Sequence, residues 1–367
     1  MRGWKSALIA VLVLGTAIGI GSLAQVGYAA PTGPEAVGRT TLRWTDDARD
    51  EPMTVDPSDH REIVAHVWYP TAPGGTVPAP YFPDLDVLRD AISDTGEIGI
   101  VELTGIGFVA THASADTPVS GTGLPILLFS PGNATNSVLY SGLLEEMASR
   151  GYVVVGVEHV YDVLGVTTAN GAPAVFAADR WPQPLDEHLA FYLERVDDRA
   201  ADLAYVVDRL TELGEGEGLF GGRLATDRIG AIGHSLGAIT AARLCQTDER
   251  VQACLNLDGL YKATPWDPRF EPPAASAFML MTRIGEPIDT GGAVTAVIDG
   301  IEHDAFGDTP TLGPALPIPG EAAADRAMRI VREYAVAFFD RALRGSTTTV
   351  LDGPSPYPEV MVRPASG

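Results

Sequence analysis

Residues 228–240 have the sequence RIGAIGHSLGAIT. A short apolar run leads to Gly233, Ser235 stands between two glycines, and a helix-compatible stretch follows Gly237. This strand–turn–helix pattern is typical of a nucleophile elbow, a sharp turn that holds a serine hydroxyl at the end of a sheet. Such a turn strains the backbone of the serine and leaves no room for side chains at positions 233 and 237. We therefore interpret Ser235 as the nucleophile of a catalytic site.

Length and composition limit the class of protein. The chain has 367 residues, of which 46% are hydrophobic and 20% charged, as in ordinary globular proteins of one large or two smaller domains. It carries 48 Asp and Glu against 25 Lys and Arg, a formal net charge of −23. Because an acidic surface repels phosphate backbones, we do not expect nucleic acid to be a partner.

The N-terminus has the pattern of an export signal. Arg2 and Lys5 are followed by an uncharged apolar stretch over residues 7–20 and then by small residues. Cleavage after Ala24 or after Ala29 fits the small-x-small rule. We predict a signal peptide over residues 1–30, a secreted protein, and no integral membrane span after its removal. An uncleaved membrane anchor is the alternative.

Apolar runs and helical periodicity alternate along the rest of the chain. Runs at 40–44 and 63–69 predict an antiparallel hairpin. Further strands are expected at 125–129, 152–157, 228–233, 251–257, 277–282 and 293–298, and helices at 137–150, 186–213 and 321–343, besides the one after the elbow. We predict an α/β fold with a mostly parallel central sheet, the antiparallel hairpin at its N-terminal side, and helices on both faces.

Several segments are less regular. We predict one domain over residues 31–345 and an irregular Pro-rich tail over 346–367. A short amphipathic helix is expected at 84–93, and residues 158–186 have no clear period, which favours a long loop or lid. Cys245 and Cys254, the only cysteines, fit either a disulfide or two buried thiols.

A serine hydroxyl needs a base, which is most often histidine. In sheets with this elbow the partners follow the serine in the order acid, then histidine. Only His303 lies after Ser235, so we interpret it as the base. His234 adjoins the nucleophile, but the sharp turn points its side chain elsewhere, and we expect a supporting or packing role.

The acid that orients His303 has more than one candidate. Asp258 ends the apolar run 251–257, on the strand expected next to the elbow strand. A carboxylate there can reach an imidazole held over the sheet, so we favour Asp258. Glu286 and Asp289, in the loop after strand 277–282, and Asp299, close to His303, are the alternatives.

The alkoxide formed during acyl transfer needs two backbone donors. One is expected to be the N–H of Leu236, directly after the nucleophile. The other is expected from the loop after strand 125–129, where Gly132 allows close approach and Asn133 offers its N–H.

With these residues in place, the chain resembles the platelet-activating-factor acetylhydrolase group of α/β-hydrolases, in particular its bacterial secreted members. The resemblance covers most of the chain after the signal and lies in six short motifs: VWYP (67–70), FSPG (129–132), GHSLG (233–237), NLDG (256–259), HDAF (303–306) and FFD (338–340). It implies an α/β-hydrolase fold, an acid at Asp258, and calcium-independent hydrolysis of esters, including short acyl groups on phospholipids. Pro131 and Leu236 depart from the histidine and phenylalanine of the animal enzymes.

These observations lead to the hypothesis of a secreted serine ester hydrolase with Ser235, Asp258 and His303 as its triad. We expect no cofactor and no metal, and a small-molecule or lipid ester as the partner. Acyl transfer to another acceptor by the same triad, or a non-catalytic binding protein on a hydrolase scaffold, are the alternatives. Phe82, Trp181 and Trp266 either line an acyl site or pack.

Overall fold

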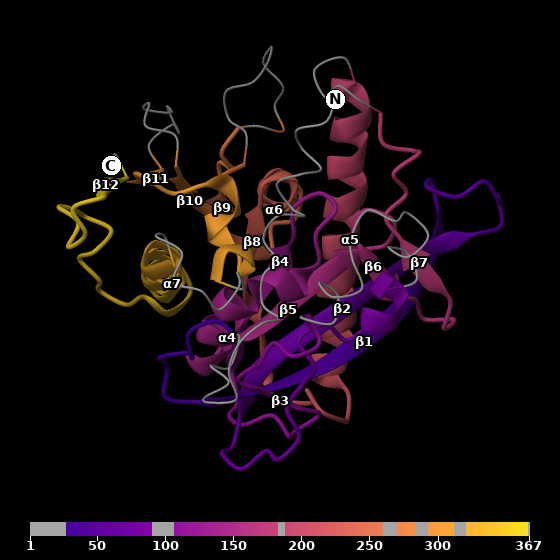
Figure 1. The fold of residues 1–367 in the computed structure, drawn as a ribbon, viewed down its shortest axis with the longest axis horizontal. Coiled ribbons are helices and arrows are strands. Elements are labelled where there is room, and N and C mark those ends of the chain that lie inside the picture. Colours follow the sequence, from indigo (N-terminus) through magenta and orange to yellow (C-terminus); the bar gives the residue numbers. More distant parts are fainter. Residues whose placement is uncertain are drawn as a thin grey trace, which may run out of the picture.

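The computed structural model describes residues 27–89, 106–182, 188–259, 269, 271–283, 293–311 and 321–365 (Figure 1). Its centre is a ten-stranded sheet in the order β12-β11-β10-β9-β8-β4-β5-β2-β1-β3. The strands are β1 (Ala36–Asp50), β2 (His60–Thr71), β3 (Ala113–Ala115), β4 (Leu124–Ser130), β5 (Val153–His159), β8 (Leu224–His234), β9 (Val251–Leu257), β10 (Ala277–Thr282), β11 (Val294–Ile298) and β12 (Val360–Arg363).

The direction of the strands confirms the predicted α/β-hydrolase architecture. From β11 across to β5, every neighbouring pair is parallel. The long strands β1 and β2 form the predicted antiparallel hairpin, and β2 joins β5 in antiparallel orientation. The central strands are continuous apolar runs because helices cover both of their faces.

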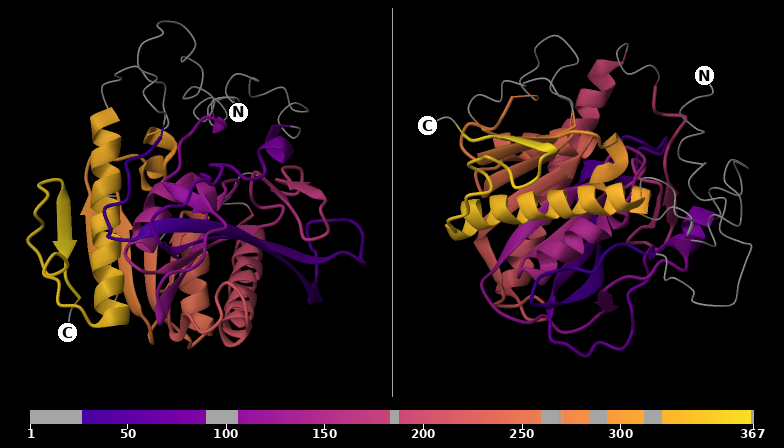
Figure 2. Two further views of the ribbon diagram at one scale, coloured as in Figure 1. Left: turned by 90° about the horizontal axis from the view of Figure 1, so that it is seen from below. Right: turned by 60° about the vertical axis from the view of Figure 1, so that its left-hand side comes forward.

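Two hydrophobic cores lie on opposite faces of the sheet, as the pleat of a strand requires. Along β4, Leu127 and Phe129 belong to one core, and Ile126 and Leu128 belong to the other. The first core is covered by α4 (Ser141–Ser149) and α7 (Glu321–Arg344), which lie side by side in Figure 2, and the second by α5 (Leu189–Glu215) and α6 (Leu236–Thr247).

Three segments differ from the sequence prediction or complete it. The tail is not wholly irregular, because β12 pairs antiparallel with β11. Residues 158–182 contain a two-stranded hairpin of β6 (Gly165–Thr167) and β7 (Pro173–Val175). Residues 85–89 are helical, and the rest of the helix predicted at 84–93 lies largely outside the described residues.

Of the two states that the sequence allowed for the cysteines, the structure has the disulfide. Cys245, near the end of α6, and Cys254, within β9, form a disulfide with a Cα–Cα distance of 6.6 Å. The bond ties the helix that follows the elbow to the strand that precedes Asp258. In the described part of the chain, no helix is long and apolar enough to cross a membrane.

Candidate active site

Ser235 occupies the turn between β8 and α6. Its backbone angles are φ 55° and ψ −121°, a region that residues with a side chain rarely adopt. A Cβ atom on Gly233 would overlap the carbonyl oxygen of Gly237, and one on Gly237 would overlap the carbonyl oxygen of Ser130. Both glycines are therefore required for α6 to pack this closely on β8 and β4, as the motif predicted.

Asp258 follows the last residue of β9, the strand that pairs with β8. Its φ is also positive, at 51°, and its N–H donates to the carbonyl oxygen of Met281 over 2.8 Å. The N–H of Ser235 donates to the carbonyl oxygen of Leu257 over 3.0 Å. The proposed nucleophile and acid therefore leave the sheet from the ends of adjacent strands.

The carboxylate of Asp258 holds the imidazole of His303. Nδ1 of His303 lies 2.6 Å from Oδ2 of Asp258, and the hydroxyl of Thr282 and Nε of Arg283 donate to the same carboxylate over 2.8 and 2.9 Å. Burial opposes ionisation of Asp258, but the hydrogen bonds from His303 and Thr282 outweigh it and lower the pKa to about 2. Since Asp258 is ionised at neutral pH, Nδ1 of His303 carries the proton and Nε2 is the acceptor.

His303 begins the 3₁₀ turn η4 (His303–Phe306), and its side chain is 38% exposed. The centroid of its ring lies 4.5 Å from that of His234, and its carbonyl oxygen lies 2.9 Å from Nε2 of His234. The proposed base is therefore next to the residue that precedes Ser235. Within the described residues, no hydrogen bond joins the hydroxyl of Ser235 to His303, a contact that in hydrolases often tightens only when substrate binds.

His234 links the elbow to its surroundings. Burial lowers its pKa to about 3, so the ring is neutral. Because Nε2 faces the carbonyl oxygen of His303, this nitrogen carries the proton, and Nδ1 accepts a hydrogen bond from the hydroxyl of Tyr140 over 2.8 Å. His234 thus has the supporting role expected from the sequence, through partners that the sequence did not identify.

The loop after β4 lies against the elbow. A Cβ atom added to Gly132 would be 3.5 Å from Cβ of Ser235, an ordinary van der Waals contact. Among the described residues, no acceptor takes the N–H of Asn133. Leu236 is the first residue of α6, where backbone N–H groups have no partner within the helix. The two segments that flank Ser235 thus carry both of the donors predicted for the oxyanion hole.

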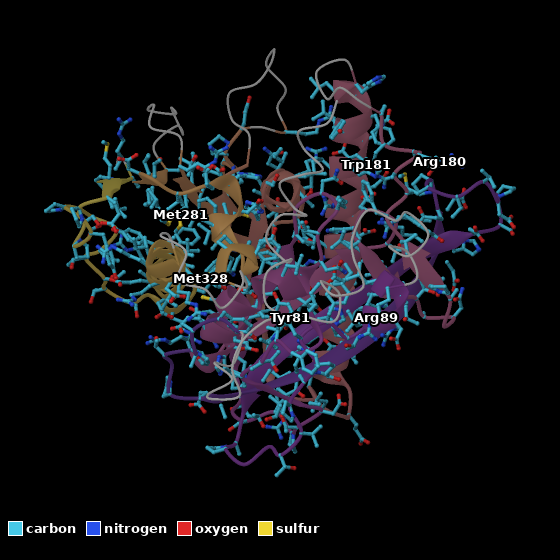
Figure 3. The ribbon with its side chains drawn as sticks, in the orientation of Figure 1. Tyr81, Arg89, Arg180, Trp181, Met281 and Met328 are labelled. Atoms are coloured by element: carbon cyan, nitrogen blue, oxygen red, sulfur yellow. A yellow bond between two sulfur atoms is a disulfide. The ribbon has the colours of Figure 1, made fainter. Side chains whose placement is uncertain are left out.

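An apolar cluster adjoins Leu236. Its buried members are Met53, Trp181, Val196, Leu236 and Ile239, and the partly exposed aromatic side chains packed against it are Tyr161, Phe176, Phe191 and Tyr192. Trp181 stacks on Phe176 with ring centroids 5.7 Å apart, and it lies beside the upper part of α5 in Figure 3. Trp181 therefore belongs to a wall next to the elbow. Phe82 packs in the core of the sheet, and Trp266 lies outside the described residues.

The other acids proposed from the sequence do not join this site within the described residues. Asp299 is exposed in the turn after β11, where its N–H donates to the carbonyl oxygen of Glu359. Glu286 and Asp289 lie outside the described part of the chain. In that part, no three or more His, Cys, Asp or Glu side chains are grouped so that they could hold a metal ion.

Three residues of the site were missed from the sequence. Tyr140 contacts His234, and Thr282 and Arg283 contact Asp258. Thr282 and Arg283 stand at the end of β10, beside the strand that carries Asp258, so the rule that parallel strands present their carboxyl ends together could have found them. No local signal marks Tyr140, which lies in η1 (Ser137–Tyr140).

The chain is similar to several known ester hydrolases. Residues 59–263 match the family model described as platelet-activating factor acetylhydrolase, isoform II. A probable 1-alkyl-2-acetylglycerophosphocholine esterase of Arthroderma benhamiae is 24% identical over 90% of this chain and 92% of its own. The dog platelet-activating factor acetylhydrolase is 24% identical over 41% of this chain and 39% of its own. A ferulic acid esterase structure from Streptomyces cinnamoneus is 29% identical, with a TM-score of 0.73 over 92% of this chain and 99% of that one.

Proposed function

The chain belongs to the platelet-activating factor acetylhydrolase isoform II family and is a carboxylic ester hydrolase, and from this premise we propose that it acts through an acyl-enzyme on Ser235. The observation that carries the proposal is the bond between Asp258 and His303, next to the strained turn at Ser235. Together these features supply an oriented base beside a serine hydroxyl that the turn holds at the end of the sheet.

In the proposed mechanism, Nε2 of His303 takes the proton of the Ser235 hydroxyl as its oxygen attacks the ester carbonyl. The N–H groups of Asn133 and Leu236 stabilise the oxyanion, and Asp258 stabilises the imidazolium without taking its proton. The imidazolium then protonates the departing alcohol and leaves an acyl-enzyme. His303 next takes a proton from the water that attacks the acyl carbon. It returns this proton to the Ser235 oxygen as the acid is released.

For the substrate, we propose esters with a short or apolar acyl group, including short acyl groups of phospholipids. The apolar cluster around Trp181 and Leu236 supports an apolar group beside the elbow. The names of the relatives cover an acetylated glycerophospholipid and an ester of an aromatic acid. An acyl-length series on simple esters, aromatic esters and phospholipids measures kcat/KM for each class. A flat series would contradict a pocket of defined acyl preference.

The mechanism is tested by Ser235→Ala. We expect it to fold as the wild type does, by circular dichroism and thermal unfolding, and to lose hydrolysis of p-nitrophenyl acetate and labelling by a fluorophosphonate. In wild type, the labelled peptide should contain Ser235, and heat-unfolded protein should remain unlabelled. Undiminished turnover by the variant would exclude the mechanism.

We also propose that the chain is exported by a signal peptide within residues 1–30. Residues 1–26 lie outside the described part, and the support is the charged and apolar pattern of the sequence. The disulfide between Cys245 and Cys254 fits an oxidising compartment. N-terminal sequencing of protein recovered from the medium tests this, and protein that keeps residues 1–24 would contradict cleavage.

A further inference from the structure

A second array of serine, histidine and aspartate lies beneath the loop that carries Asn133. The hydroxyl oxygen of Ser130 is 2.9 Å from Nε2 of His159, and Nδ1 of His159 is 2.8 Å from Oδ2 of Asp202. All three residues are 0% exposed, in contrast to the partly exposed His303. Because no substrate can reach a fully buried hydroxyl, this array is not a second hydrolytic site.

The protonation states of the array follow from its partners. Arg61 and Arg49 both donate hydrogen bonds to the carboxylate of Asp202. Burial would raise the pKa of this carboxyl, but the charge of Arg61 outweighs burial and holds the pKa well below its usual range. His159 must therefore donate from Nδ1. Burial lowers the pKa of His159 to about 3, so Nε2 is unprotonated and accepts the hydroxyl proton of Ser130. The array thus fixes the rotamer of Ser130, at the start of the loop.

Arg199 holds the next residue of the loop. This arginine of α5 is 0% exposed, and its Nη2 donates to the carbonyl oxygen of Pro131 over 2.6 Å. Its Nε and Nη1 have no hydrogen-bond partner in the described structure. Burial lowers its pKa to about 10, and the charges of Asp162 and Asp202 oppose this shift, so the guanidinium stays charged at neutral pH. A buried cation with so few partners is costly, and its one hydrogen bond goes to the loop.

We propose that Arg199 and His159 are positioning residues that hold the Ser130–Asn133 loop in the geometry of the oxyanion hole, an inference that rests on the proposed function. They form hydrogen bonds with Ser130 and Pro131, the two residues directly before Gly132 and Asn133. The next contact along the chain, from the N–H of Ala134 to the carbonyl oxygen of Asp162 over 2.9 Å, fixes the far side of the loop. Asn133, between these anchors, keeps an N–H without an acceptor among the described residues.

The test is Arg199→Met, which keeps the length of the side chain but removes the donors. We expect kcat for p-nitrophenyl acetate to fall about 10²-fold, as for a loss of precise placement, while KM changes less than about twofold. The affinity for an alkyl boronic acid, whose tetrahedral adduct on Ser235 places an oxygen in the hole, should fall in parallel with kcat/KM. The matched control is Arg39→Met in β1, a buried arginine whose Nη2 also donates to a backbone carbonyl oxygen, that of Pro80, and not to the loop.

An unchanged kcat in Arg199→Met, or a lower kcat with full affinity for the boronic acid, would overturn the inference. The same loss in Arg39→Met would also overturn it, because a general loss of buried charge would then explain the effect. If Arg199→Met does not fold, Ser130→Ala decides, with an expected fall of about tenfold in kcat and boronic acid affinity, and no fall as the contrary result. Activity in Ser235→Ala would instead reject the proposed function itself.

Discussion

Nδ1 of His303 lies 2.6 Å from Oδ2 of Asp258, although 45 positions separate them in the chain. The contact joins a strand end to a 3₁₀ turn that follows another strand, and two further donors, from Thr282 and Arg283, converge on the same carboxylate. The position of the imidazole therefore depends on one charged group, which makes that group the first target for substitution.

Asp258→Asn should lower kcat about 10³–10⁴-fold with little change in stability. The amide can present an N–H to Nδ1, which favours the tautomer that has its proton on the wrong nitrogen. Ester hydrolysis and urea unfolding measure the two effects. Asp299→Asn, Glu286→Gln and Asp289→Asn are the controls and should stay active. If one of these controls lost activity while Asp258→Asn stayed active, the residue changed in that control would be the acid instead.

Asp308 should make stability depend on pH. It is fully buried behind the His303 turn, where burial raises its pKa to about 8 against the opposing N–H of Gly142 and charge of Arg332. Between about pH 4 and 8 the folded state keeps a proton that the unfolded state has lost, so stability falls as pH rises. In Asp308→Asn this slope should be smaller by about one proton, or about 1.4 kcal/mol per pH unit.

Urea unfolding from pH 5 to pH 8 checks this expectation. Glu158, whose pKa burial also raises to about 8, contributes in the same direction and should leave part of the slope in the variant. A slope identical to that of the wild type would show that Asp308 does not hold its proton in the folded state.

The segment around Tyr28 should contribute to stability. Tyr28 is buried, and its hydroxyl donates to Oε1 of Glu145 over 2.7 Å. We expect Tyr28→Phe to lower the free energy of unfolding by about 1–2 kcal/mol, since a buried carboxyl loses a donor. A chain that begins at Ala30 should lose about 3 kcal/mol or more relative to one that begins at Gln25, because the ring is also lost. Equal unfolding midpoints for the two chains would contradict this.

The disulfide between Cys245 and Cys254 closes a short loop, with a sequence separation of 9. In the chain-entropy model a loop of this size stabilises the folded state by about 2–3 kcal/mol. Unfolding of the wild type with and without reductant should differ by about that amount, whereas Cys245→Ala/Cys254→Ala should not respond to reductant. A reductant effect in the double variant would show that it acts elsewhere.

Much of the fold could be predicted because the central strands are apolar on both faces. β10 has the predicted bounds, 277–282. The motif also implied that side chains at positions 233 and 237 would overlap the neighbouring backbone, which the structure shows. β12 was missed because an edge strand of four residues, three of them exposed or partly exposed, has no periodic pattern of its own. It forms only because β11 offers it a partner.

The site was predictable where chain order constrains it and obscure where it depends on packing. Ser235, Asp258 and His303 follow the order expected after an elbow. Elimination could select only His303, the one histidine after Ser235. Asp258 was favoured over three other acids by its place at the end of the strand next to the elbow strand and by the family resemblance. Tyr140, Arg199 and His159 act through contacts between elements far apart in the chain. No residue spacing in the sequence predicts such partners.

The pairing of β12 with β11 bears on how the protein should be handled. β12 (Val360–Arg363) covers the main-chain groups of β11 at one edge of the sheet. Trimming the C-terminus would bare the main-chain donors and acceptors of β11, a surface on which other molecules can add strands. Affinity tags are best appended after Gly367 with a flexible spacer, and shortened versions should be checked for aggregation before any loss of catalysis is attributed to chemistry.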